Sequence, residues 1–107
     1  MRSVVARIAI AIFASVICCG TVFAQQSAED IYNHKCAVCH GKDGLGKTMK
    51  GKQVHVKDVH ENMKDSEADM IKVVTNGKGE NMDAYKGELT PQQIKDVVNY
   101  YRSLGQK

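Results

Sequence analysis

The run Cys36-Ala37-Val38-Cys39-His40 constrains this chain more than any other feature. Two cysteines three positions apart, followed at once by a histidine, form the C-x-x-C-H pattern of covalent haem attachment. Thiols at this spacing can form thioethers with the two vinyl groups of one porphyrin, and the histidine can then bind the iron. The motif therefore predicts that Cys36 and Cys39 bind haem c and that His40 is an axial ligand of its iron.

The same two cysteines are open to other interpretations. A thioredoxin-like dithiol needs a βαβ context, which this sequence does not show. Half of a zinc site needs a second pair of ligands, yet the other cysteines are Cys18 and Cys19, in the apolar N-terminal segment. A thiol oxidoreductase that uses Cys36 and Cys39 without haem remains an alternative.

Residues 1–24 have the pattern of a cleaved secretory signal peptide. Arg2 and Arg7 form a positive start, an apolar run follows, and Val22-Phe23-Ala24 offers small residues where a signal peptidase reads them. An uncleaved anchor is less favoured, because about 20 apolar residues are needed to span a bilayer and Arg7 shortens the run. We expect cleavage after Ala24 and a single periplasmic domain of residues 25–107. Its two remaining cysteines are both used by the haem, which leaves no structural disulfide.

The mature chain is small and nearly neutral. The formal net charge of +3 includes both arginines of the signal, and without them 13 basic and 12 acidic residues remain. This balance excludes a nucleic-acid binder. Four tyrosines are its only aromatic residues, so a domain this short needs a further source of stability, which the haem supplies as part of the core.

Charge is distributed unevenly along the mature chain. Residues 41–57 contain five lysines and one aspartate, whereas residues 58–69 contain five acidic residues and one lysine. Such polarity can orient a protein toward a charged partner. Solvated loops of no functional meaning are the alternative.

Three helices and no strands are predicted. Each begins at a capping residue: Ser27 to Cys36, Ser66 to Gly77, and Thr90 to Gly105. In the last of them Pro91 occupies the first turn and Gln93 completes a capping box with Thr90. The stretches between the helices, 41–65 and 77–88, are predicted to be irregular loops that wrap the haem. Val54, Val56 and Val59 are expected to line its pocket.

On these motifs the chain resembles the class I c-type cytochromes, most closely the small bacterial periplasmic monohaem members. The resemblance covers residues 27–105. It rests on C-A-V-C-H-G-K-D-G-L-G after a short helix, on N-G-K-G-E-N-M-D-A-Y-K-G-E-L-T-P, and on a closing amphipathic helix. It implies an all-α small cytochrome c fold, with three main helices and long loops around one covalently attached haem.

The resemblance also implies a function. The protein is expected to be a monomeric electron carrier, not an enzyme, that exchanges single electrons with redox protein partners and binds no small-molecule substrate. It implies that Met82 is the distal axial ligand, because members of the family place a methionine in a loop of this kind. Asp83 follows where the family usually has proline, which leaves the loop less stiff. A haem enzyme or a protein that binds peroxide or a diatomic gas, with a labile Met82, is the alternative.

Further methionines and histidines could bind the iron, and four residues are expected where the first helix crosses the last. Met49, Met63 and Met70 are expected in the core. His55 and His60 are alternative axial ligands, and His34 is expected to face solvent. The resemblance implies that Ala28 and Tyr32 cross Val97 and Tyr100, with alanine where most members have glycine. The sequence names no hydrogen-bond acceptor for the ring of His40.

Overall fold

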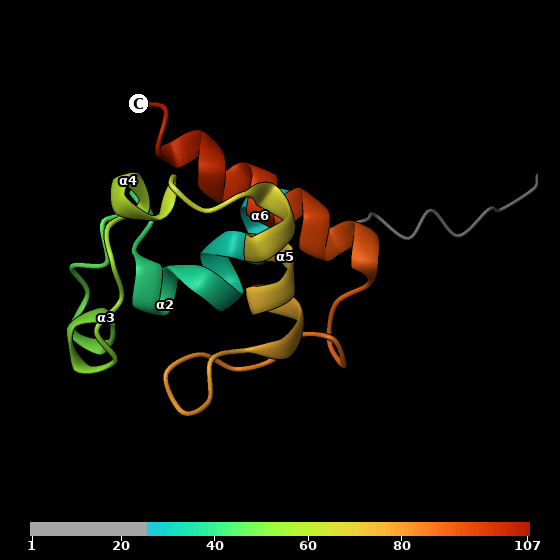
Figure 1. The fold of residues 1–107 in the computed structure, drawn as a ribbon, viewed down its shortest axis with the longest axis horizontal. Coiled ribbons are helices and arrows are strands. Elements are labelled where there is room, and N and C mark those ends of the chain that lie inside the picture. The colour runs from blue at the N-terminus through green and yellow to red at the C-terminus, as the bar shows by residue number, and fades with distance from the viewer. Residues whose placement is uncertain (1–25) are drawn as a thin grey trace, which may run out of the picture.

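The computed structural model describes residues 26–107 (Figure 1), so the predicted signal peptide lies outside the described residues. These residues form helices joined by loops, with an isolated bridge between Lys78 and Met82 in place of any strand. The helices are α1 (Ala28–Ile31), η1 (Tyr32–Cys36), α2 (Ala37–His40), α3 (Met49–Gln53), α4 (Val59–Asn62), α5 (Glu67–Asn76) and α6 (Pro91–Leu104). The predicted all-α fold is confirmed.

The first predicted helix begins where expected but ends later. The Ser27 side chain accepts a hydrogen bond from the Asp30 amide at 3.1 Å, which caps α1. α1, η1 and α2 then follow one another without a break, so the helical segment continues beyond Cys36 through the whole C-x-x-C-H motif to His40. η1 is a wide π-helical turn that ends at Cys36, the first residue of this motif, and such turns often mark functional sites.

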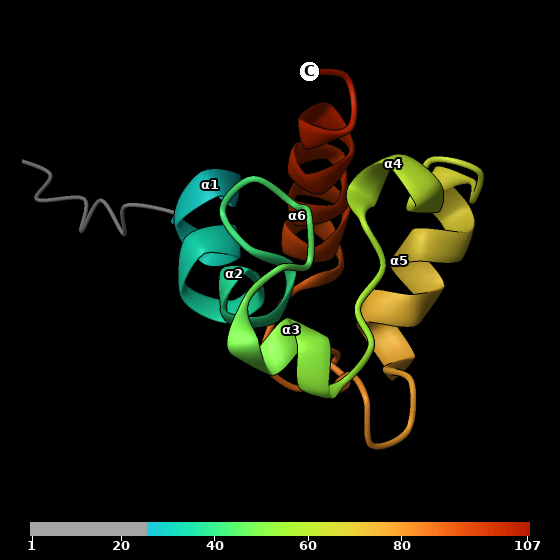
Figure 2. The same cartoon turned by 90° about the vertical axis from the view of Figure 1, so that its left-hand side faces the viewer.

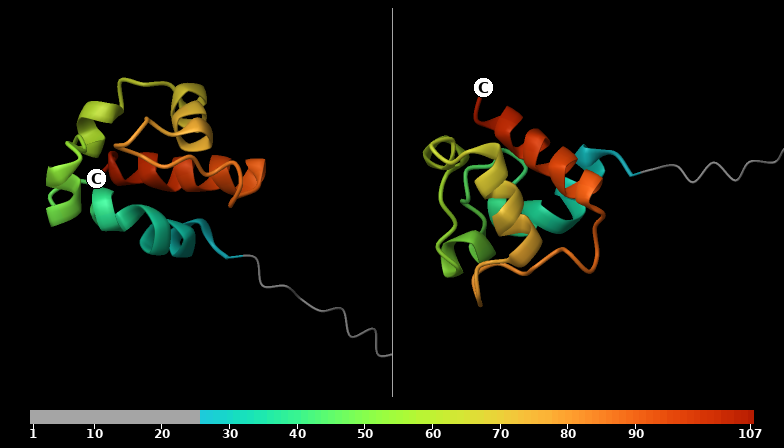
Figure 3. Two further views of the ribbon diagram at one scale, coloured as in Figure 1. Left: turned by 90° about the horizontal axis from the view of Figure 1, so that it is seen from below. Right: turned by 45° about the vertical axis from the view of Figure 1, so that its right-hand side comes forward.

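The two longer helices begin and end as predicted. Ser66 caps α5, and at α6 the Thr90 side chain and the Gln93 side chain each accept from the other residue's amide, at 3.1 and 2.9 Å. α6 lies between α5 and the N-terminal helical segment (Figure 3). The crossing of α6 with that segment is confirmed, with the rings of Tyr32 and Tyr100 5.2 Å apart.

The hydrophobic core is formed at this crossing. Its buried side chains come mostly from the N-terminal helical segment and α6, and they are Ile31, Tyr32, Ala37, Val59, Leu89, Ile94, Val97 and Leu104. Tyr32 also donates a hydrogen bond from its hydroxyl to the Gly41 carbonyl at 2.6 Å, which holds the end of α2 against the core. The core is small, as expected for a chain of this length.

The prediction of an irregular loop over residues 41–65 is wrong in part, because the segment contains α3 and α4. Thr48 caps α3 by accepting from the Gly51 amide at 2.9 Å, and Asp58 caps α4 by accepting from the His60 amide at 2.8 Å. Helices this short show no apolar period in sequence. Figure 2 shows α3 beside α2, and a Cβ atom at Gly51 would collide with the Cys39 carbonyl, so only glycine permits this packing.

Within residues 26–107, no helix combines the length and the apolar character needed to cross a bilayer.

Candidate haem-binding site

A cavity of about 580 Å³ opens between the N-terminal helical segment, α5, α6 and the loop over residues 77–88. All four residues that the sequence analysis assigned to the haem line it: Cys36, Cys39, His40 and Met82. The cysteines and the histidine come from one helical segment, whereas the methionine comes from a loop far along the chain. The fold thus brings together residues that the sequence keeps apart.

The two cysteines are free thiols and half-buried. Burial raises the pKa of the Cys36 thiol to about 11, with the nearby Lys35 lowering it only in part. A nucleophilic thiol needs the opposite shift, because the thiolate is the reactive form. This argues against the dithiol oxidoreductase.

His40 presents a neutral imidazole to the cavity. Burial lowers the pKa of its ring, which favours the uncharged form that a metal ligand needs. Its Nδ1 atom is buried and has no hydrogen-bond partner among the described residues. Like the sequence, the described residues therefore offer no hydrogen-bond acceptor for the His40 ring. The ring instead meets Tyr101 in an edge-to-face arrangement, with the centroids 5.1 Å apart.

The loop that carries Met82 is closed on itself. The Lys78 amide donates to the Met82 carbonyl at 2.9 Å, which forms the isolated bridge. Gly77 begins the loop at a φ of +74°, and a Cβ atom there would come within 2.6 Å of the Met82 carbonyl oxygen. Asp83 is exposed and also lines the cavity. Glycine is therefore required at position 77 for the loop to hold Met82 where it lies.

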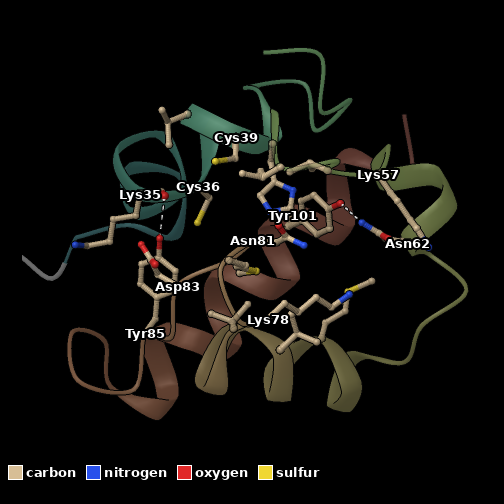
Figure 4. A pocket seen from close by; sticks show the side chains of 18 of the residues that line it. Lys35, Cys36, Cys39, Lys57, Asn62, Lys78, Asn81, Asp83, Tyr85 and Tyr101 are labelled. Carbon is tan, nitrogen blue, oxygen red and sulfur yellow. Dashed lines mark hydrogen bonds between the residues drawn. The ribbon is translucent and has the colours of Figure 1, made fainter. Parts of the chain in front are cut away.

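Two side-chain contacts tie the ends of the cavity, as Figure 4 shows. At one end the Tyr85 hydroxyl donates to the Lys35 carbonyl at 3.2 Å. The Lys35 side chain also forms an ion pair of 3.1 Å with Glu88. At the other end Asn62 donates to the Tyr101 hydroxyl at 2.8 Å. These contacts join residues distant in sequence, and no local pattern signals them.

The other methionines and His34 differ in how far they are buried. Met70 is buried and Met63 half-buried, as expected, but Met49 is 81% exposed, so its prediction as a core residue is wrong. α3 turns this side chain outward because Gly51 on the same short helix packs against α2. His34 is exposed, as expected, and its Nδ1 lies 2.7 Å from the Asp30 carbonyl oxygen.

The alternative axial histidines differ from each other. His60 is exposed and its Nδ1 lies 2.6 Å from a carboxylate oxygen of Asp58, away from the cavity. The pKa of His60 is raised, chiefly by its hydrogen bond to Asp58. His55 does line the cavity, but it is exposed and has a φ of +58°. Val54 and Val56 line the cavity as predicted, whereas Val59 is buried in the core instead.

The cavity fits a haem. Its volume lies within the range of about 300–1,000 Å³ usual for cofactor sites. Its donors are two thiols, an imidazole and a thioether, the set that c-type haem uses. Among residues 26–107 there is no group of three or more histidine, cysteine or acidic side chains that could hold a bare metal ion. The donors are therefore suited to an iron that brings its own porphyrin nitrogens.

The sequence of this chain is similar to those of known proteins. The model of the family described as cytochrome c oxidase, cbb3-type, subunit III matches residues 23–100. The "cytochrome c6-like" protein of Nostoc sp. is 36% identical over 76% of this chain and 71% of its own length. The cbb3-type cytochrome c oxidase subunit FixP of Azorhizobium caulinodans is 30% identical over 80% of this chain, which spans only 29% of that protein.

A solved structure agrees with these sequence matches. The KustC0563 c-type cytochrome superposes with a TM-score of 0.69 at 27% identity, covering 74% of this chain and 98% of that one. The family match, the sequence relative from Nostoc sp. and the solved structure all point to a c-type cytochrome, as the C-x-x-C-H motif and the helical fold of this chain do. The chain therefore belongs to the family described as cytochrome c oxidase, cbb3-type, subunit III, and it is a small class I c-type cytochrome that carries electrons on haem c.

Proposed function

We propose that Cys36 and Cys39 attach the haem through thioethers and that His40 and Met82 are the axial ligands of its iron. The observation that carries the proposal is the common cavity that all four side chains line. Cys36 comes from the end of η1, Cys39 and His40 come from α2, and Met82 comes from the loop over residues 77–88. Attachment at three points of one short helical segment prevents the cofactor from dissociating. Haem c supplies reversible one-electron chemistry at iron.

The chain's own residues make this site suitable for electron transfer alone. With haem bound, the neutral imidazole of His40 and the thioether of Met82 would both bind the iron, so no position on it would be left for a substrate. Methionine ligation raises the potential relative to ligation by two histidines. We therefore propose that the protein is not an enzyme, and nothing in the cavity favours the alternative of a site for peroxide or a diatomic gas.

Location and partners follow from the N-terminus and the relatives. The signal peptide proposed for residues 1–24 would deliver the domain of residues 25–107 to the periplasm. FixP is named as an oxidase subunit, and this supports a partner among membrane or periplasmic electron-transfer complexes. We expect a monomer that meets such partners briefly, through a small interface.

A visible spectrum combined with a redox titration of the mature protein tests this function. We expect the absorption of a covalent haem c, one reversible one-electron step, and no rapid binding of carbon monoxide to the reduced protein at neutral pH. Rapid stoichiometric binding of carbon monoxide would instead establish the gas-binding or enzymatic alternative. A mature protein purified without covalent haem mass would return the dithiol function to consideration.

The ligand set has its own test in Met82→Ala. A thioether binds ferrous iron better than ferric iron, so its loss should lower the midpoint potential, open the reduced iron to carbon monoxide and remove the weak far-red band of ferric iron bound to sulfur. Met49→Ala, Met63→Ala and Met70→Ala are the matched controls and should keep that band. An unchanged Met82→Ala spectrum would show that the ligand is wrong and would make His55 the next candidate, because it lines the cavity.

A further inference from the structure

The His40 ring lacks the usual device that orients a metal-binding histidine. Such histidines almost always donate their second ring N–H to a carboxylate, a carbonyl or a water, which fixes the plane of the imidazole. In the described part of this chain, Nδ1 of His40 is buried and has no such partner. Because Nδ1 is enclosed by protein, Nε2 is the nitrogen left for iron. Rotation of the ring about its Cβ–Cγ bond must then be limited by packing.

Tyr101 supplies that packing from the closing helix. Its ring meets the His40 ring at 5.1 Å between centroids with an interplanar angle of 65°, an edge-to-face geometry. Both residues line the cavity. An aromatic ring in this position blocks rotation of the imidazole without forming a hydrogen bond to it.

Tyr101 is itself held at two points. Its hydroxyl accepts a hydrogen bond from Asn62 of α4 at 2.8 Å, as Figure 4 shows. Its ring stacks on the buried ring of Tyr32 at 6.2 Å with an interplanar angle of 26°. A side chain fixed at both its ring and its hydroxyl can act as a rigid stop. Tyr100, the neighbouring residue, also packs on Tyr32 but has no ring contact with His40 among those the structure shows.

We infer that Tyr101 is a positioning residue for the axial histidine, and that its ring, anchored by Asn62 and Tyr32, sets the plane of the His40 imidazole in place of a hydrogen bond at Nδ1. The inference rests on the proposed ligation of iron by His40. The plane of an axial imidazole splits the iron d orbitals, so it is read directly in the ferric spectrum. Tyr101 also lines the cavity, and an apolar ring beside the histidine should reduce the access of water, which affects the potential.

The test compares two leucine variants of the mature holoprotein. Tyr101→Leu should shift and broaden the low-spin ferric electron paramagnetic resonance signal, because the imidazole then adopts several planes, and should lower the midpoint potential as water enters. Tyr100→Leu is the matched control: it loses an aromatic ring from the same helix and the same tyrosine cluster, yet its signal and potential should stay as in the wild type. Tyr101→Phe keeps the ring contact but loses the hydrogen bond from Asn62, so its signal should lie between those of the wild type and Tyr101→Leu.

Asn62→Leu keeps both rings and removes only the anchor of the hydroxyl, so it serves if Tyr101→Leu does not yield folded holoprotein. It should broaden the signal in the same direction, and an unchanged signal would overturn the inference. Equal spectral changes in Tyr100→Leu and Tyr101→Leu would overturn it as well. The small amount of holoprotein expected from His40→Ala tests the proposed ligand separately from the positioning role. If its low-spin signal is intact, His40 is not the ligand. If that signal is lost and Tyr101→Leu changes nothing, only the positioning role of Tyr101 fails.

Discussion

At the scale of single residues, the loop that carries Met82 depends on a glycine. Gly77 and Gly79 both have positive φ values, +74° and +54°, which favour glycine over other residues. Only at Gly77 would an added Cβ atom meet rigid backbone, the Met82 carbonyl at 2.6 Å and the Ala84 amide at 2.8 Å. Beside Gly79 there is nothing within 4 Å. Comparison of alanine substitutions at the two positions therefore distinguishes the effect of backbone strain alone from the effect of a collision that displaces Met82.

We expect Gly77→Ala to weaken the bond between Met82 and iron. The substitution should reduce the far-red sulfur band and admit carbon monoxide to the reduced protein, because the collision moves the loop. Gly79→Ala is the control, with a cost of about 1–2 kcal/mol from the left-handed conformation alone and an unchanged spectrum. Spectra and carbon monoxide titrations of both variants measure this. Equal spectra for the two variants would show that the collision is relieved without moving the sulfur.

At the scale of elements, capping side chains fix where the longer helices begin. The capping box of α6 joins Thr90 and Gln93 through two hydrogen bonds, and Pro91 occupies a position whose missing N–H costs nothing. α6 contributes Ile94, Val97 and Leu104 to the core, so its first turn determines how these residues face η1. A local hydrogen bond thereby supports the packing that encloses the cavity.

Removal of this cap should cost measurable stability. We expect Thr90→Ala to lower the free energy of unfolding by about 1 kcal/mol, since the Gln93 amide loses its acceptor. Gln92→Ala on the same turn loses only an exposed contact with Asp96 and should cost about 0.2–0.5 kcal/mol. Urea unfolding of the holoproteins, followed by circular dichroism, gives both values. A Thr90→Ala cost no larger than that of Gln92→Ala would contradict the role of the cap.

The N-terminal helical segment should also depend on the haem for its stability. The core is small and the cavity of about 580 Å³ takes the place of further core, so we expect attachment and folding to be one event. Cys36→Ser and Cys39→Ser should therefore give much less folded holoprotein, and His40→Ala less still. The yield of haem-containing protein and circular dichroism of the product measure this. A helical apoprotein that unfolds cooperatively would count against it.

At the scale of the whole molecule, exposed lysines and exposed apolar side chains lie on adjoining segments. α3 and the loop before it carry exposed lysines, Lys42, Lys47, Lys50 and Lys52, close to the C-x-x-C-H segment. Val38 and Met49 are exposed by 61% and 81%, and they are the large hydrophobic side chains most open to solvent in the described part of the chain. The Thr48 hydroxyl joins the two segments by donating to the Val38 carbonyl at 2.7 Å. Exposed apolar side chains and lysines on adjoining segments suit brief contact with an acidic surface.

We expect the rate of electron exchange with an acidic redox partner to fall as ionic strength rises, because salt screens these lysines. Lys50→Glu with Lys52→Glu should slow the reaction at low salt and remove most of its salt dependence. Lys86→Glu with Lys95→Glu makes the same change of net charge on residues outside α3 and its loop, and should have a smaller effect. Stopped-flow rates over a range of salt concentrations measure this. If the rate of the wild type does not change with salt concentration, the lysines of α3 and the loop before it are not the docking surface.

The sequence by itself determined the chemistry of the protein and where its main helices begin. Both depend on residues that are close together in the sequence. The haem motif is Cys36 to His40, and each of the caps Ser27, Ser66 and Thr90 binds a residue three positions later. The tertiary structure alone decided the rest, because those features depend on which distant residues meet. α3 and α4 are too short for an apolar period, Met49 faces solvent because Gly51 packs against Cys39, and Tyr101 reaches the His40 ring only after α6 has folded back across the N-terminal helical segment.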